Sequence, residues 1–184
     1  EKILSGVYSN NKASDNIQNL DLYALFVSDS TITPTASTSA YGLRVKSPIE
    51  KFDYRGEYTF ENVKATTIDS DENQLDIEIG YLVHSASKSR FSAEYFSASN
   101  NFDQLFPTGH KWLGFADLFG RRNIKGFRFG ASAQPTENFK CSLDYHSFQR
   151  VETATGAYKL NGTSYGAVGS NSDIGNEVDL TLSY

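Results

Sequence analysis

The sequence predicts an all-β protein, an antiparallel up-and-down β-barrel that crosses a membrane with about nine strands in this chain. Three observations predict it. Apolar and polar residues alternate with a period of two, the connections between these segments alternate between longer and shorter, and tyrosine and phenylalanine gather near the segment ends. Aromatic residues make up 14% of the 184 residues, and the 11 tyrosines and 13 phenylalanines among them favour strands.

The first four predicted strands lie before residue 62. Residues 2–9 form a weak strand, and residues 20–28 (LDLYALFVS) form a strand that is apolar almost throughout. Residues 39–46 (SAYGLRVK) and 52–61 (FDYRGEYTFE) alternate cleanly, with aromatic and aliphatic side chains on one face and charged side chains on the other. Two chemically different faces are therefore expected from the third strand onward.

Five more segments carry the same period. Residues 75–83 (LDIEIGYLV) and 90–97 (RFSAEYFS) are the fifth and sixth predicted strands. Residues 127–133 (FRFGASA), 139–148 (FKCSLDYHSF) and 177–184 (EVDLTLSY) complete the set. Such alternation fits a soluble sheet with its apolar face inward, and equally a membrane barrel with that face toward lipid and its charges in a wet lumen.

Connection lengths favour the membrane barrel. Residues 47–51, 84–89 and 134–138 are short turns, whereas the intervening connections are longer, including polar loops at 62–73 and 150–176. Outer-membrane barrels have short turns at the periplasmic end and longer loops outside, while a Greek-key sandwich has no reason to separate lengths in this way.

We predict a single barrel segment over residues 1–184 with one long insertion at residues 100–126. The insertion has no strand period, yet it is dense in aromatic and leucine side chains, so it must pack against something. Bacterial single-chain barrels normally have an even number of strands and no open edge in lipid. Nine strands, the absence of methionine and the absence of a leader therefore predict a piece of a larger barrel.

A family resemblance supports this prediction. The stretches FDQLFPTGHKWLGFADLFGRRNIKGFRFGAS, FKCSLDYHSF and GNEVDLTLSY, which begin at Phe102, Phe139 and Gly175, resemble the bacterial alginate-export family of outer-membrane barrels. The resemblance implies a barrel of about eighteen strands, of which this chain would be the later part. It also implies passive passage of an anionic polysaccharide, or of small solutes, across the bacterial outer membrane.

The alternation assigns charged side chains to the lumen face. This set consists of Arg44, Lys46, Arg55, Glu57, Asp76, Glu78, Glu94, Arg128, Lys140, Asp144, Glu177 and Asp179. Its arginines and lysines suit a passing carboxylate. The alternative is that they pair with neighbouring Asp and Glu across the strands. Acids outnumber bases in this set, so this part of the wall predicts no electropositive tunnel by itself.

The insertion adds candidate contacts of its own. Basic and aromatic residues that could constrict the pore or grip a sugar are His110, Lys111, Trp112, Phe115, Arg121 and Arg122. The alternative is that Trp112, Leu113, Phe115, Leu118 and Phe119 fold the loop back onto the barrel wall as a plug or rim. Both can hold together.

Other function classes lack sequence support. The net charge of −5 argues against nucleic-acid binding, and the three histidines lie on separate segments without metal-ligand spacing. We therefore expect no cofactor, no metal and no enzymatic activity, with membrane lipid and a small solute or anionic glycan as partners. Two functions stay open: an outer-membrane porin-like channel that works by passive diffusion, and a soluble β-sheet binding or adhesion domain with an aromatic docking loop.

Overall fold

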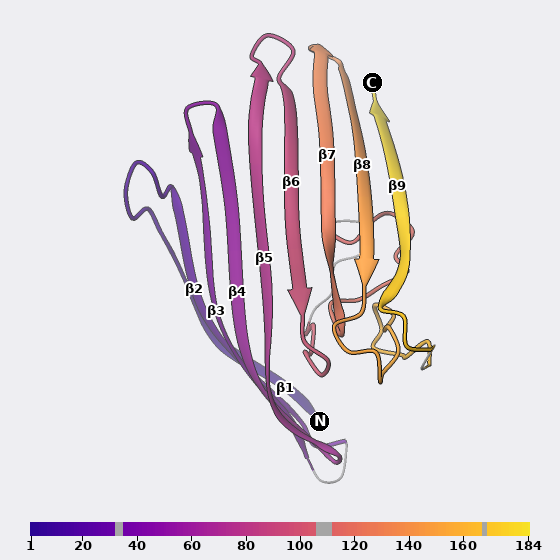
Figure 1. Ribbon diagram of the computed structural model, residues 1–184. Helices are drawn as coiled ribbons and strands as arrows, with labels where there is room; N and C mark the ends of the chain where they lie inside the picture. The colour runs from indigo at the N-terminus through magenta and orange to yellow at the C-terminus, as the bar shows by residue number, and fades with distance from the viewer. Residues whose placement is uncertain (32–34, 106–111, 167–168) are drawn as a thin grey trace.

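The computed structural model describes residues 1–31, 35–105, 112–166 and 169–184. Within these residues, nine strands form one curved antiparallel sheet in which the strands follow chain order (Figure 1). The strands are β1 (Lys2–Asn11), β2 (Asn19–Asp29), β3 (Ala36–Ile49), β4 (Phe52–Ala65), β5 (Ile68–His84), β6 (Ser89–Ala98), β7 (Ile124–Thr136), β8 (Phe139–Gln149) and β9 (Asp173–Ser183). The predicted all-β, antiparallel, up-and-down architecture is confirmed.

The sheet is open. Each strand pairs with its neighbours in sequence, and in the described residues β1 and β9 are the two edges and do not pair with each other. No helix among the described residues is long and apolar enough to cross a membrane.

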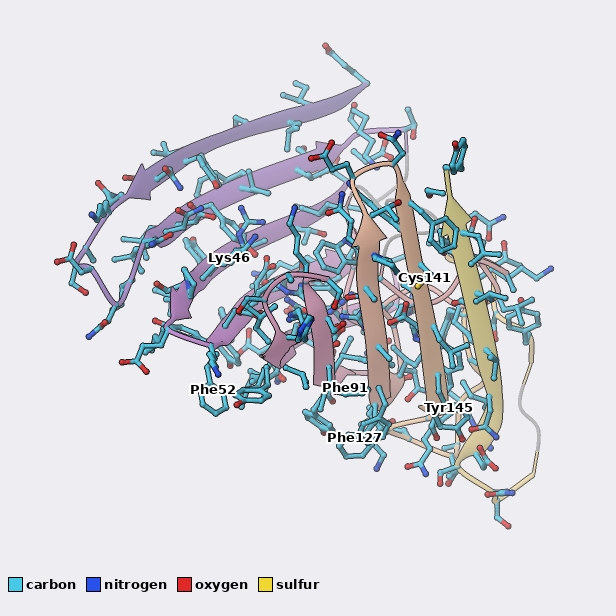
Figure 2. All side chains as sticks on the ribbon, turned by 90° about the horizontal axis from the view of Figure 1, so that it is seen from above. Lys46, Phe52, Phe91, Phe127, Cys141 and Tyr145 are labelled. Carbon is cyan, nitrogen blue, oxygen red and sulfur yellow. The ribbon has the colours of Figure 1, made fainter. Side chains whose placement is uncertain are left out.

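The convex face of the sheet is apolar and exposed. Figure 2 shows Phe52, Phe91 and Phe127 projecting from the same side of the sheet. A soluble barrel or sandwich would require apolar side chains such as Ile77, Ile79, Phe129 and Leu180 to meet in a dry centre. Their exposed fractions are instead 44%, 56%, 54% and 65%, respectively, so these side chains form no such centre among the described residues.

The two ends of the sheet differ in their connections. The connections at residues 12–18, 50–51, 85–88 and 137–138 lie at one end, and the other four connections lie at the opposite end (Figure 1). One of these four differs from the prediction, because residues 62–73 do not form a loop. They continue β4 and β5 to a two-residue turn at Thr66 and Thr67.

The β6–β7 loop, which we define as residues 99–123, carries the apolar core. β6 ends at Ala98 and β7 begins at Ile124, so the last residues of the predicted insertion already belong to a strand. The buried cluster is formed by Phe96, Ala98, Phe102, Leu113, Ile124 and Phe148. It lies on the concave face between the loop and the wall, opposite the apolar convex face.

Candidate functional site on the concave face

Charged side chains of alternate residues in β4 to β8 converge on the concave face. Arg128, on β7, is the centre of one group. Its guanidinium lies 2.7 Å from Glu78, 2.6 Å from Glu94 and 3.2 Å from Asp144. The four residues come from four neighbouring strands, so this group joins the wall from β5 to β8.

Arg55, on β4, extends the network toward β1. It lies 3.2 Å from Asp76, 3.1 Å from Glu78 and 3.3 Å from Glu94. Glu94 is 2% exposed and Asp76 is 1% exposed, so the guanidinium groups compensate carboxylates that are almost fully removed from water. The alternative in which lumen arginines pair with acids across strands is therefore observed for Arg55 and Arg128.

The β6–β7 loop reaches this network through two side chains. The ring of Trp112 lies under the guanidinium of Arg55, 4.2 Å from its centre, in a cation–π contact. Arg121 donates from Nη1 to Oε1 of Gln74 at 2.8 Å and from Nη2 to Asp76. Both loop residues thus touch the wall at β4 and β5.

A second attachment lies on β9. The backbone N–H of Ala116 donates to Oε1 of Glu177 at 2.7 Å, and the N–H of Phe115 donates to Oδ2 of Asp179 at 3.3 Å. The loop that leaves β6 and returns to β7 therefore contacts β4 and β5 on one side and β9 on the other. It crosses the concave face.

A third attachment lies where β3, β4 and β5 approach the loop end of the sheet. The N–H of Asp103 donates to Glu61 at 2.9 Å, and Thr38 donates its hydroxyl to Asp103 at 3.2 Å. The N–H of Asn101 donates to Glu72 at 3.2 Å, and Glu72 faces Glu61 across the β4–β5 pairing. Several wall carboxylates therefore serve as acceptors for the loop, which accounts for part of their excess over the bases.

Aromatic packing supports these polar contacts. The rings of Phe119 and Phe148 are 5.1 Å apart between centroids, and Trp112 and Leu113 pack in the same cluster. Phe115 and Leu118 behave differently, because they are 49% and 46% exposed. The predicted packing of the loop against the wall is observed for Trp112, Leu113 and Phe119, whereas Phe115 and Leu118 keep nearly half of their surface exposed.

Asn123 joins the β6–β7 loop to the β8–β9 loop. It is fully buried, it has a positive φ of 50°, and its amide donates to Oγ1 of Thr155 at 2.8 Å and to the carbonyl of Gly156 at 3.1 Å. Its Oδ1 accepts from the N–H of Glu152 at 2.8 Å. Arg150, 1% exposed, donates to carbonyls within the β8–β9 loop, including that of Thr155 at 2.8 Å.

A cavity of about 420 Å³ lies between the loop and the β1–β5 part of the wall. Its lining includes Tyr23, Glu57, Trp112 and Arg121. Glu57 accepts a hydrogen bond from the hydroxyl of Tyr23 at 2.8 Å. The lining combines aromatic rings with carboxylate and amide groups.

The remaining predicted residues lie apart from the network. The guanidinium of Arg44, on β3, lies 2.5 Å from the carboxylate of Asp21, on β2. Lys46 and Lys140 are exposed, and among the described side chains neither has a carboxylate within ion-pair distance. Arg122 stacks on Tyr158 at 4.2 Å and donates to the carbonyl of Asn100, so it joins loop residues to one another. His110 and Lys111 lie outside the described residues.

Several residues of the site are absent from the predicted set. Asp21, Glu61, Glu72, Gln74 and Arg90 are buried or partly buried on the concave face, and Arg90 lies 2.6 Å from Glu78. Glu61 has the same parity as Arg55 along β4, and Arg90 has the same parity as Glu94 along β6, so the alternation contained the signal for both. Within the described ranges, no group of three or more His, Cys, Asp or Glu is arranged to hold a metal ion.

The model of a protein family described as alginate export matches residues 2–184. No curated protein matches the chain.

Proposed function

The chain belongs to the alginate-export family, and from that premise we propose that it forms part of the wall of an outer-membrane channel that solutes or an anionic polysaccharide cross by passive diffusion. The family is one of transport across the outer membrane and not of catalysis. The observation that carries the proposal is the sidedness of the sheet, with exposed apolar side chains on the convex face and a buried ion network on the concave face.

The convex face suits lipid. A transmembrane β-strand needs about 9–11 residues when tilted. The described strands have 10 to 17 residues, so each is long enough to cross the hydrocarbon layer. An unpaired edge is not tolerated in lipid, and we therefore propose that additional strands pair with β1 and β9 to complete a barrel.

The β6–β7 loop would narrow the channel. Because it contacts β4 and β5 on one side and β9 on the other, it obstructs the space enclosed by the concave face. Loops of outer-membrane barrels are longer on the external side, so we place the end with this loop outside the cell. Trp112 and Phe115 are the aromatic residues that we propose contact a passing sugar.

The test is conductance of the purified full-length protein in a planar lipid bilayer. We expect steady current steps, and we expect a uronate oligomer, if it is the solute, to reduce the current more than a neutral oligosaccharide of equal length does. Failure of both oligomers to change the current would remove the polysaccharide from the proposal. Extraction of a monodisperse soluble monomer without detergent would contradict the channel itself.

A further inference from the structure

We infer that Arg121 is the positioning residue that holds the crossing segment (residues 112–123) against the wall, and that it thereby sets the largest solute that the channel passes. This inference rests on the proposed channel function. It concerns a residue of the loop and the wall groups that receive it, all of which lie in the described part of the chain.

The guanidinium of Arg121 is buried against polar side chains of β5. Arg121 is 8% exposed, and it binds the amide of Gln74 and the carboxylate of Asp76, which are 5% and 1% exposed. Its backbone N–H also donates to Oε1 of Gln104, in the first part of the same loop, at 2.8 Å. One residue therefore connects both arms of the loop to β5.

The wall does not depend on Arg121 for its own ion pairs. Asp76 and Glu94 keep Arg55 at 3.2 Å and 3.3 Å, and Glu94 also keeps Arg128 at 2.6 Å. Glu94 is 4.0 Å from Arg121, at the limit of an ion pair. Removal of the Arg121 side chain thus leaves these carboxylates compensated by residues of the strands, and its main effect falls on the loop.

The other polar attachments of the loop are mostly made by its backbone. Asp103, Phe115 and Ala116 donate their N–H groups to Glu61, Asp179 and Glu177. Any residue except proline supplies such a group, so these contacts specify little about which side chain docks. Among the described loop residues, Arg121 supplies the guanidinium that reaches wall carboxylates, whereas the guanidinium of Arg122 donates to Asn100 and Asn101 of the loop.

Lysine should replace Arg121 only in part. An ammonium can pair with Asp76, but it is a point charge and does not offer the planar fork that reaches Gln74 and Asp76 together. Arg121→Lys should therefore hold the segment more loosely than arginine and more tightly than alanine.

The experiment compares single-channel conductance and the size limit for sugar entry in liposome-swelling assays, with full-length protein. For Arg121→Ala we expect conductance to rise roughly two-fold or more, because a pore narrowed by a loop widens when the loop is released. Larger oligosaccharides should then enter, and Arg121→Lys should give intermediate values. Lys125→Ala, which removes a cation from the start of β7 on the other face of the sheet, is the matched control and should behave as wild type.

A purely structural role for Arg121 would lower the yield of folded channels without raising the current through each one. Equal single-channel conductance and equal size limits for wild type, Arg121→Ala and Arg121→Lys would overturn the inference while leaving the channel in place. An absence of current in the wild-type protein would overturn the proposed function and this inference with it.

Discussion

The convex and concave faces of the sheet share every strand, but different contacts hold their side chains. On the convex face the large apolar side chains touch in cross-strand pairs, such as Phe52 with Tyr81 at 4.8 Å and Tyr95 with Phe127 at 5.2 Å between centroids. On the concave face, buried carboxylates such as Asp76 and Glu94 are held by arginines of the strands and of the loop. The stability of the convex face therefore depends on the surrounding medium. The stability of the concave face depends on specific ion pairs and hydrogen bonds.

The variant with the largest expected effect tests whether ion pairs stabilise the concave face. Arg128→Ala removes the group that lies within 3.2 Å of three carboxylates, one of which is Glu94. Breaking a buried ion pair by removal of one partner costs roughly 3–5 kcal/mol, so we expect the free energy of unfolding to fall by about that amount. Urea-induced unfolding in lipid vesicles measures it.

Lys140→Ala is the control for this change, because it removes an exposed cation of the same face and should alter stability by no more than about 0.5 kcal/mol. Equal losses for the two variants would show that the network does not stabilise the wall.

The second prediction tests the dependence on the medium with adjacent residues of β8. Leu143 is 48% exposed on the convex face, and its neighbour Ser142 has the opposite parity. An arginine on the lipid face costs roughly 2–4 kcal/mol at the bilayer midplane, whereas the lumen tolerates charge. Leu143→Arg should therefore destabilise the protein by that amount, and Ser142→Arg should cost clearly less in the same unfolding assay. A larger loss for Ser142→Arg would reverse the assignment of the faces.

The third prediction concerns the loops that cover the concave face. Asn123→Ala removes the amide that joins the two loops and leaves the N–H of Glu152 and the carbonyl of Gly156 without it. An unsatisfied buried group costs about 1–3 kcal/mol, so we expect faster proteolysis of the β8–β9 loop with little change in the strands. Limited proteolysis followed by mass spectrometry locates the cleavage. Cleavage rates equal to those of wild type would show that Asn123 does not hold the two loops together.

The smallest expected effect is the coupling energy of an aromatic pair, which we compare between the two faces. A double-mutant cycle on Tyr95 and Phe127, with leucine substitutions, should give a coupling energy of about 0.5–1 kcal/mol, typical of cross-strand aromatic pairs. The inner pair Phe96 and Phe148, with centroids 6.1 Å apart under the loop, serves as the comparison. Because its surroundings are closed, single substitutions there should cost more than those on the outer pair. Equal single-substitution costs would erase the contrast between the faces.

The sequence predicted the strands well where the two faces of the sheet differ in chemistry. The alternation of apolar and charged residues along β4 to β9 requires two different surroundings, and it assigned residues such as Arg55, Glu94 and Arg128 to one face. The prediction failed at residues 62–73, where β4 and β5 continue to Thr66 and Thr67. There the side chains on both faces are largely polar, so the period of two no longer appears as apolar alternation.

The loop contacts could not be predicted for a different reason. Glu61, Gln74 and Glu177 become acceptors only once a segment far away in sequence lies over them, and a strand period does not report what covers its face. The aromatic density of the insertion predicted that it packs, and Leu113 and Phe119 do so. That density could not indicate that Phe115 and Leu118 stay about half exposed.

The order of the strands also bears on how the chain assembles. Each hairpin joins neighbours in sequence, so the sheet can grow one strand at a time from either edge. The crossing segment needs Glu177, 61 positions beyond Ala116, before its last attachment can form. Until β9 is in register, Phe96 and Phe148 lack the packing of Ile174, and transiently exposed apolar surface of this kind favours aggregation. The loop can therefore be fully attached to the concave face only after β9 has joined the sheet.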